Sequence, residues 1–527
     1  MALTSCGDVA DEVTGIVYGR NFSPVGFEAK SITENSATLQ WTAVSGATGY
    51  DLEIFADDSL TFEGSPTVTY SDISADYVKY VVEGLMYDTK YSARVRALDS
   101  SDESRNSKWS TVFFQTSAQQ ILNSIKTTRD VGDRNVHLSW DAAEHDLTTV
   151  IIRNENGEIV VSYTLNDEDR AAGEVTLAGL SPETTYTAKL YNNGKERGSR
   201  KFTTIADLNG AITVRPSEDL KDIIANAEDG AVLALYGGTY NIQNDNEETG
   251  ATEITAAMVK KNLTIKGIYS DDVPVIKGRF QIDGGVSLEL NQVVLDGSEN
   301  KTDDQAFNFK STADVPSLIV KNSEIKGFVK GVFYANTQIT IGQILFDGCT
   351  IHDIVCDGGD LFDSRKAYIK DLKLNDCTIY NCAQSRDFIR MDDASSKFSG
   401  AAPVITVNHC TINNVCNETA NKRLLYVRFK GNVITWTNNL LTNTLAVYSN
   451  QTSTSMPTFS NNAYFGCSDN LLTKVEADGK VTYPVYDEGG QKVDDPKYSN
   501  AAGGNFTIGN EDVSKLGVGA TKWYTAK

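Results

Sequence analysis

The chain has 527 residues, 40% of them hydrophobic and 22% charged, which is the composition of an ordinary folded protein too long for one hydrophobic core. Its formal net charge of −22 argues against nucleic acid as a partner, since binding the phosphate backbone depends on basic clusters. The sequence has no apolar run of about 18 residues, which excludes a membrane-spanning helix.

Residues 1–19 predict an anchor and tether. Residues 3–6 read LTSC, which resembles the lipobox of bacterial lipoproteins, where the cysteine acquires lipid after a signal peptide is removed. The resemblance implies lipidation of Cys6, with Met1 and Ala2 standing in place of the signal peptide. The polar stretch at residues 7–12 fits a tether. The alternative is a chance match of four residues.

Residues 20–118 and 119–206 each predict a β-sandwich. Short alternating strands surround an early tryptophan, Trp41 in the first segment and Trp140 in the second. Each segment also has a leucine six residues before a tyrosine that starts a strand, at residues 85–91 and 180–186. Both segments resemble fibronectin type III domains, although the first lacks the proline of the corner motif. The resemblance implies spacer modules without functional residues.

Residues 207–240 predict a helical cap followed by a buried strand. Ser217 is placed as an N-cap, and Leu220, Ile223, Ile224 and Ala227 follow helical spacing. A strand at residues 230–235 and a turn at residues 237–240 come next. This opening resembles the N-terminal cap of pectate-lyase-like right-handed β-helices, and residues 495–498 with 504–508 resemble their closing segment.

A repeated signature predicts the fold of residues 207–527. Residues 346–351 read FDGCTI, and related copies stand at 374–379 (LNDCTI) and 407–412 (VNHCTI). Weaker copies lie at 320–325, 436–439 and 459–462, so the spacing varies between 23 and 33 residues. A solenoid of short strands tolerates such variation because insertions enter the loops. We therefore predict an all-β chain: two fibronectin type III-like sandwiches followed by a right-handed parallel β-helix with an N-terminal capping helix.

Six cysteines follow this repeat. Cys349, Cys377 and Cys410 occupy one position of the signature, and Cys356, Cys382 and Cys416 follow them at varying distances. These spacings are not the CxxC units of metal sites, although disulfides would suit an exported protein. We favour free thiols stacked in the interior of the solenoid.

A second strand of each repeat predicts a polar strip. Segments 306–310, 332–336, 361–365, 388–392 and 426–430 align, and residues two apart share one face of a strand. The alignment pairs Asn308 with Lys310, Tyr334 with Asn336, Asp363 with Arg365, Arg390 with Asp392, and Arg428 with Lys430. Because rungs lie roughly 4.8 Å apart, about the length of a sugar residue, a glycan could run along the strip.

The strip predicts a glycan-binding site rich in arginine. Arginine pairs bidentately with carboxylates, which suits a uronate polymer, and tyrosine offers a stacking face. The predicted binding residues are Lys310, Tyr334, Asn336, Asp363, Arg365, Arg390, Asp392, Arg428 and Lys430. The alternative is a structural ladder whose charged residues pair with one another across the rungs.

A catalytic interpretation stays open. The resemblance to pectate-lyase-like enzymes implies Arg390 as a base and calcium as a cofactor held by acidic residues. The candidate calcium ligands are Asp360, Asp363, Asp387 and Asp392, with Asp357 and Asp393 nearby. No motif of the known lyase families stands in the sequence, however. A glycosidase would need two carboxylates across a bond, for which Asp363 and Asp392 are available. The four histidines fit structural or surface positions.

The order of segments also resembles the surface lipoproteins of gut Bacteroidota that belong to polysaccharide-utilisation systems. That resemblance implies a lipid-anchored protein on the extracellular face of the outer membrane. It implies a polysaccharide ligand, such as the pectin homogalacturonan, and an outer-membrane transporter complex as partner. The two alternatives are a calcium-dependent polysaccharide lyase and a structural or adhesive surface protein.

Overall fold

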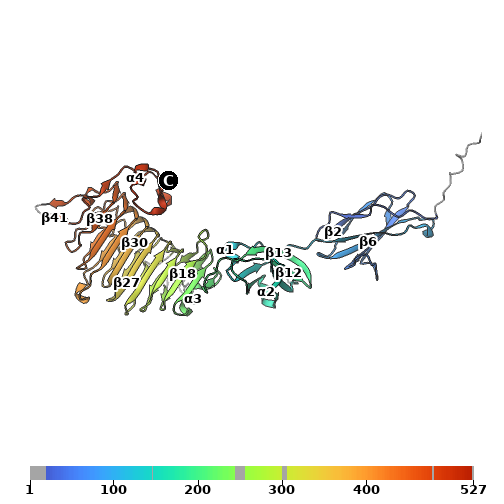
Figure 1. The fold of residues 1–527 in the computed structure, drawn as a ribbon, viewed down its shortest axis with the longest axis horizontal. Helices are drawn as coiled ribbons and strands as arrows, with labels where there is room; N and C mark the ends of the chain where they lie inside the picture. Colours follow the sequence, from blue (N-terminus) through green and yellow to red (C-terminus); the bar gives the residue numbers. More distant parts are fainter. Residues whose placement is uncertain (1–18, 145, 244–255, 300–304, 478–479, 525–527) are drawn as a thin grey trace, which may run out of the picture. The chain divides into compact units, whose positions relative to one another are not determined.

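The computed structural model describes residues 19–144, 146–243, 256–299, 305–477 and 480–524 (Figure 1). The chain forms two compact units, residues 1–207 and 208–527. Within the described residues, no helix has the length and apolar character needed to cross a bilayer. Cys6 and residues 1–18 of the predicted tether lie outside the described part of the chain.

The first sandwich packs two antiparallel sheets around Trp41 and Tyr91. One sheet has the strand order β1-β2-β5 and the other β4-β3-β6-β7. The elements are β1 (Glu28–Lys30), β2 (Ser36–Gln40), β3 (Gly49–Ala56), β4 (Val68–Ser74), β5 (Lys79–Glu83), β6 (Lys90–Leu98), the 3-10 helix η2 (Glu103–Arg105) and β7 (Ser110–Gln115).

The second sandwich packs the sheet β11-β8 against the sheet β10-β9-β12-β13 around Trp140. Its elements are α1 (Thr127–Asp130), β8 (Asn135–Ser139), β9 (Thr149–Asn154), β10 (Ile159–Thr164), α2 (Asp167–Ala172), β11 (Glu174–Ala178), β12 (Thr185–Asn192) and β13 (Lys195–Thr203).

Both sandwiches contain the predicted tyrosine corner. The hydroxyl of Tyr91 accepts a hydrogen bond from the backbone N–H of Met86 at 2.8 Å, and that of Tyr186 accepts one from Ser181 at 2.9 Å. The two rings are 2% and 3% exposed, so each hydroxyl finds its partner inside the fold. The corner confirms the predicted sandwich fold of both segments.

Residues 208–527 form a parallel β-helix, seen in Figure 1 as a stack of strands from β18 to β38. Three parallel sheets build it. The first ten-stranded sheet contains β14 (Ile212–Val214), β15 (Ala231–Leu235), β18 (Leu263–Gly267), β21 (Leu288–Asn291), β24 (Val315–Lys321), β27 (Thr340–Asp347), β30 (Tyr368–Asn375), β33 (Val404–Asn408), β36 (Val433–Thr437) and β38 (Thr458–Ser460).

The strands of the other two sheets come between successive strands of the first sheet along the chain. The second ten-stranded sheet contains β16 (Thr239–Asn241), β19 (Val275–Lys277), β22 (Val294–Asp296), β25 (Glu324–Lys326), β28 (Thr350–Ile354), β31 (Thr378–Cys382), β34 (Thr411–Val415), β37 (Leu440–Thr442), β39 (Ala463–Phe465) and β42 (Gln491–Lys492). The seven-stranded sheet contains β17 (Ala257–Val259), β20 (Phe280–Ile282), β23 (Gln305–Phe309), β26 (Gly331–Ala335), β29 (Phe362–Ser364), β32 (Ile389–Met391) and β35 (Leu425–Val427).

The repeat signature aligns in space as it does in sequence. Phe346 pairs with Leu374, which pairs with Val407, and Trp436 and Phe459 continue the row. The row is buried from Phe346 to Trp436, where each residue is 0% exposed. The third residue of each copy takes a left-handed backbone, as at Asp376 (φ 53°) and His409 (φ 50°).

The predicted cap is helix α3 (Leu220–Asn226), and it buries Leu220 and Ile224 against the core. Its N-cap is Asp219, whose carboxylate accepts a hydrogen bond from the N–H of Asp222 at 3.0 Å. The predicted N-cap, Ser217, therefore lies two residues too early. The negative charge of the Asp219 carboxylate also interacts favourably with the positive end of the helix dipole.

A buried polar group lies near the C-terminal end of the β-helix. Tyr448, Tyr464 and Asp487 form a buried hydrogen-bonded group, in which the Tyr464 hydroxyl donates to Asp487 at 2.8 Å. The remaining elements are η3 (Ser395–Lys397), η4 (Asp469–Leu471), β40 (Val475–Ala477), β41 (Lys480–Tyr483), β43 (Tyr498–Asn500), η5 (Ala501–Gly503), β44 (Asn505–Ile508), α4 (Glu511–Lys515) and η6 (Thr521–Trp523).

The C-terminal tail, residues 516–524, crosses the outer face of the second ten-stranded sheet. Gly519 donates to the Asn438 carbonyl at 2.8 Å, and Ala520 donates to the Thr411 hydroxyl at 2.9 Å. Thr411 is consequently 1% exposed. A Cβ on Gly519 would lie 2.6 Å from the Thr411 hydroxyl, and its φ is +84°, so this crossing requires glycine.

The cysteines behave as predicted in part. All seven described cysteines are free, and six of them are buried. Cys349, Cys377 and Cys410 stack at one corner, where each thiol donates to backbone carbonyls. The second group is out of register, because Cys382 pairs with Val415 rather than Cys416.

Candidate functional site

The outward face of the seven-stranded sheet carries two rows of polar side chains. In the middle row, registered backbone pairing joins Gln281, Asn308, Tyr334, Asp363, Arg390 and Tyr426. The edge row stands two residues later in each strand, on the same face, and contains Lys310, Asn336, Arg365, Asp392 and Arg428. The structure thus brings together most of the predicted strip.

The last rung differs from the sequence alignment. Arg390 pairs with Tyr426, and Met391 pairs with Val427, so Arg428 belongs opposite Asp392. The alignment had placed Arg428 opposite Arg390, a slip of two residues that keeps the face and changes the neighbour. Lys430 consequently lies beyond the strand, where its side chain is 75% exposed and its Nζ is 3.6 Å from Asp393.

Arg365 is held by two carboxylates. Its Nε and Nη2 donate to the two oxygens of Asp363 at 2.5 and 2.9 Å, and its Nη2 also donates to Asp360 at 3.2 Å. Asp363 and Asp360 are 1% and 3% exposed, so the guanidinium provides the charge that these buried carboxylates need. Burial raises the pKa of Asp363, although the Arg365 hydrogen bonds act in the opposite direction.

Arg390 is held in the same manner on the next rung. It donates to both oxygens of Asp392, at 3.1 and 3.2 Å, and to Asp360 at 3.3 Å. Burial acts to lower the pKa of Arg390, but the hydrogen bonds to Asp392 produce a net increase. A general base must be deprotonated before it can accept a proton from the substrate. The Arg390 guanidinium is therefore poorly suited to the role that the lyase interpretation assigns to it.

A third pair completes the network. Arg423 donates from Nη2 to Asp387 at 2.5 Å, and the N–H of Asp387 donates to Asp360 at 3.0 Å. The guanidinium carbons of Arg423 and Arg390 lie 4.4 and 4.9 Å from the centre of the Tyr426 ring. The ring therefore adds a cation–π contact to both arginines. Tyr426 and Arg423 were absent from the predicted site because the alignment slipped at their rung.

The aspartates do not fit a calcium site in this arrangement. Asp360, Asp363, Asp387 and Asp392 each point at a guanidinium, which occupies the oxygens that a cation would need. The described residues contain no group of three His, Cys, Asp or Glu side chains placed to hold a metal ion. For the same reason, Asp363 and Asp392 are engaged by arginine rather than facing each other as a glycosidase pair.

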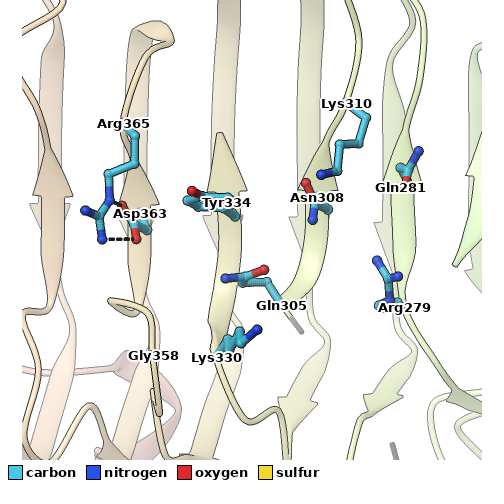
Figure 2. Close-up of a pocket in the computed structure, with 10 residues that line it drawn as sticks. All are labelled: Arg279, Gln281, Gln305, Asn308, Lys310, Lys330, Tyr334, Gly358, Asp363 and Arg365. Carbon is cyan, nitrogen blue, oxygen red and sulfur yellow. Dashed lines mark hydrogen bonds and ion pairs between the residues drawn. The ribbon is translucent and has the colours of Figure 1, made fainter. Parts of the chain in front are cut away.

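A depression of about 500 Å³ lies beside this network, over strands β20 to β29 (Figure 2). Among its lining residues, the sequence predicted Lys310, Tyr334, Asp363 and Arg365 and aligned Asn308 with them. The residues that sequence reasoning missed are Arg279, Gln281, Gln305, Lys330 and Gly358. Residues 280–282 alternate as the later rungs do, so starting the alignment one rung earlier would have found Gln281.

Tyr334 lies in the middle of the labelled group, between Asp363 on one neighbouring strand and Asn308 on the other (Figure 2). Its ring is partly buried, and burial raises the pKa of its hydroxyl. The hydroxyl therefore stays protonated at neutral pH and can both donate and accept a hydrogen bond. The Tyr334 ring can therefore stack on the apolar face of a ligand, while the neighbouring amide and ammonium groups bond the polar edge of that ligand.

Three segments of the chain match family models. Residues 22–113 match the fibronectin type III domain, residues 238–382 match the domain of unknown function DUF4957, and residues 405–523 match the domain of unknown function DUF5123. The chain is also 23% identical to tenascin of Gallus gallus over 257 residues, which are 48% of this chain. It covers only 13% of the length of that relative.

Two solved structures also resemble part of the chain. A segment of two fibronectin type III domains from chicken tenascin is 18% identical, with a TM-score of 0.25, over 34% of this chain and 99% of that one. The FN1–FN3 domains of chicken CNTN1 are 16% identical, with a TM-score of 0.18, over 38% and 71% of the two chains. The family match identifies a fibronectin type III domain at residues 22–113, before the β-helix that carries the two rows.

Proposed function

We propose that this chain is a cell-surface protein that captures an acidic polysaccharide along the seven-stranded sheet. The observation that carries the proposal is the middle row, in which six side chains from six consecutive rungs stand in register from Gln281 to Tyr426. Rungs are roughly 4.8 Å apart, close to the length of a sugar residue, so each rung can meet one unit of an extended glycan.

The charge of the face supports an acidic ligand such as homogalacturonan. The edge row presents Lys310 and the 41% exposed side chain of Arg428, although the whole chain carries a net charge of −22. Long-range steering of a polyanion is therefore unfavourable. At physiological salt, where the screening length is about 8 Å, local cations decide the contact.

The proposal includes an anchor at Cys6, based on the LTSC sequence, and delivery of the glycan to an outer-membrane transporter complex. We expect the chain, placed behind a lipoprotein signal peptide in a Gram-negative host, to fractionate with the outer membrane. A Cys6→Ser variant should move to the soluble periplasmic fraction. An unchanged distribution of the variant would remove the anchor from the proposal.

Affinity electrophoresis in polygalacturonate, combined with an absorbance assay for unsaturated uronate, tests the ligand. We expect retarded migration without product for the wild-type chain, and weaker retardation for Tyr334→Ala. Lys373→Ala serves as the control, because Lys373 lies on the first ten-stranded sheet and pairs with Asp371. Product formation would instead indicate a lyase. Unretarded migration of the wild-type chain would favour the structural or adhesive interpretation.

A further inference from the structure

The rows of the seven-stranded sheet divide into two electrostatically different parts. From Asp360 to Arg428, arginines alternate with carboxylates, and Arg365, Arg390 and Arg423 each have an ionic partner. In the depression, four of the ten lining residues are cationic and one, Asp363, is acidic. Because Asp363 already binds Arg365, it does not neutralise Lys310 and Lys330, which line the same depression.

These two lysines differ from several other lysines of the β-helix in having no ionic partner among the described residues. Lys310 and Lys330 form no ion pair with any carboxylate of the described residues, in contrast to Lys321 and Lys373 on the first ten-stranded sheet. Figure 2 shows Lys310 and Lys330 on either side of Asn308 and Gln305, which belong to the same strand. An anion entering the depression therefore meets two ammonium groups that no carboxylate of the described residues neutralises.

The other lining groups suit a sugar. Gln281, Gln305 and Asn308 offer amides that can bond hydroxyls, and Tyr334 offers a ring face beside them. A volume of about 500 Å³ lies within the range of small-molecule sites, about 300–1,000 Å³. The combination of a ring, amides and unneutralised ammonium groups matches a sugar residue that carries a negative charge.

We propose that the depression is a subsite for one anionic sugar residue, whose carboxylate or sulfate is bound by Lys310 and Lys330 while its ring lies over Tyr334. This inference rests on the proposed function and narrows it. The two lysines select an acidic glycan over a neutral one, whereas Arg365, Arg390 and Arg423 are positioning residues that hold the face in shape. The chemistry shared by the possible ligands is an anionic substituent on a pyranose ring.

Calorimetric titration of the full chain tests the subsite with three probes of equal length: an oligogalacturonide, a sulfated galacto-oligosaccharide and a neutral galacto-oligosaccharide. We expect the wild-type chain to bind one or both anionic probes at least tenfold more tightly than the neutral probe. The double variant Lys310→Ala/Lys330→Ala should lose that preference at low salt and retain the weak binding of the neutral probe. Comparing the carboxylated and sulfated probes identifies which anion the site takes.

The matched control is Lys321→Ala/Lys373→Ala, which removes the same charge from another face and should keep the preference. A second pair, Lys310→Gln/Lys330→Gln, keeps a polar side chain of most of the original length without the charge and should behave as the alanine pair does. Equal loss in both alanine pairs, or no loss in either, would overturn the subsite while leaving glycan capture intact. A wild-type preference for the neutral probe would also overturn it. Failure of the wild-type chain to bind any probe would overturn the proposed function itself.

Discussion

Asp360 is the residue on which the charged network depends most. It accepts from Arg365, Arg390 and the N–H of Asp387, so donors from two rungs meet at one carboxylate that is 3% exposed. The Asp360 oxygens take the place of water as hydrogen-bond acceptors for two guanidinium groups. Removing the Asp360 carboxylate leaves both guanidinium groups with fewer acceptors. The network is therefore a stability element as well as a feature of the surface.

We predict that Asp360→Ala lowers the free energy of opening at β29 and β32 by about 2–4 kcal/mol. The lower part of the range for broken buried pairs applies because the side chains of Arg365 and Arg390 are 28% and 22% exposed. Hydrogen exchange of amides in those strands measures the change. Asp393→Ala, which removes a carboxylate that is 31% exposed, should cost less than about 1 kcal/mol. Equal costs for the two variants would contradict the role given to Asp360.

His352 predicts a pH dependence of stability. Its ring bonds Glu324 at 3.1 Å and Asp353 at 2.8 Å, and stacks on Tyr380. Burial acts to lower the pKa of His352, but the two carboxylates raise it above its usual 6.5. The hydrogen bond from His352 lowers the pKa of Glu324 to about 2, with Lys326 contributing.

The sign of each contribution follows from these shifts. The stability from His352 is fully present below about pH 6.5 and is lost as pH rises through its raised folded pKa. The stability from Glu324 is present above about pH 4.5 and is lost as pH falls towards about 2. We expect the protection of β28 amides, corrected for intrinsic exchange, to be greater at pH 6 than at pH 8. His352→Gln should remove the difference, while His409→Gln, which faces the Tyr524 hydroxyl, should keep it.

At the scale of the strand, alternation separates core from surface within one element. In β33, Val407 is fully buried in the row of the repeat signature, whereas Val404 is 38% exposed. The two residues are chemically identical and three positions apart. Their difference in burial therefore isolates the contribution of core packing.

We expect Val407→Ala to destabilise the β-helix by about 2 kcal/mol through lost burial and a cavity, and Val404→Ala by less than about 0.5 kcal/mol. Hydrogen exchange in β30, β33 and β36 provides the measurement, because those strands contact the substituted position. A similar cost at both positions would show that the predicted core row does not carry the packing energy.

Much of the β-helix could be predicted from sequence because its period of two is strict. The signature residues fall in one buried row, and four aligned rungs of the seven-stranded sheet have the predicted register. The slip at Tyr426 arose because the loop before β35 is long, and alternation alone fixes the face without fixing the partner. The sequence also left open whether Arg365 pairs with Asp363, which is buried. Alternation along a strand shows which face a side chain lies on and does not show how deeply the side chain is buried.

At the scale of the whole chain, the C-terminal tail is tied to several rungs. Thr521 bonds Asp376 through its N–H at 2.5 Å and its hydroxyl at 2.7 Å, and the Trp523 indole donates to Thr378 at 2.6 Å. Lys522 reaches Thr350 at 2.7 Å. These contacts lie far apart in sequence and close the outer face of the second ten-stranded sheet.

We predict that Asp376→Ala releases the tail. Loss of both Thr521 hydrogen bonds should increase the exchange of amides in residues 516–524 by at least tenfold. Asp371→Ala is the control, since Asp371 is a carboxylate of the first ten-stranded sheet that bonds Gln343 and Lys373. Tail protection that persists in Asp376→Ala would show that the other tail contacts, among them the hydrogen bonds of Gly519, Ala520 and Trp523, hold the segment without Asp376.

The tail also sets a rule for insertions and deletions. Its partners Thr350, Thr378, Thr411 and Asn438 come from four successive turns of the solenoid, so the tail spans a fixed number of turns. Loss or duplication of a whole turn before β25 would leave every tail contact in place. The same event between β28 and β37 would put the tail out of step by one turn. The length of this protein can therefore vary at its N-terminal turns, while the C-terminal turns behave as a block of constant size.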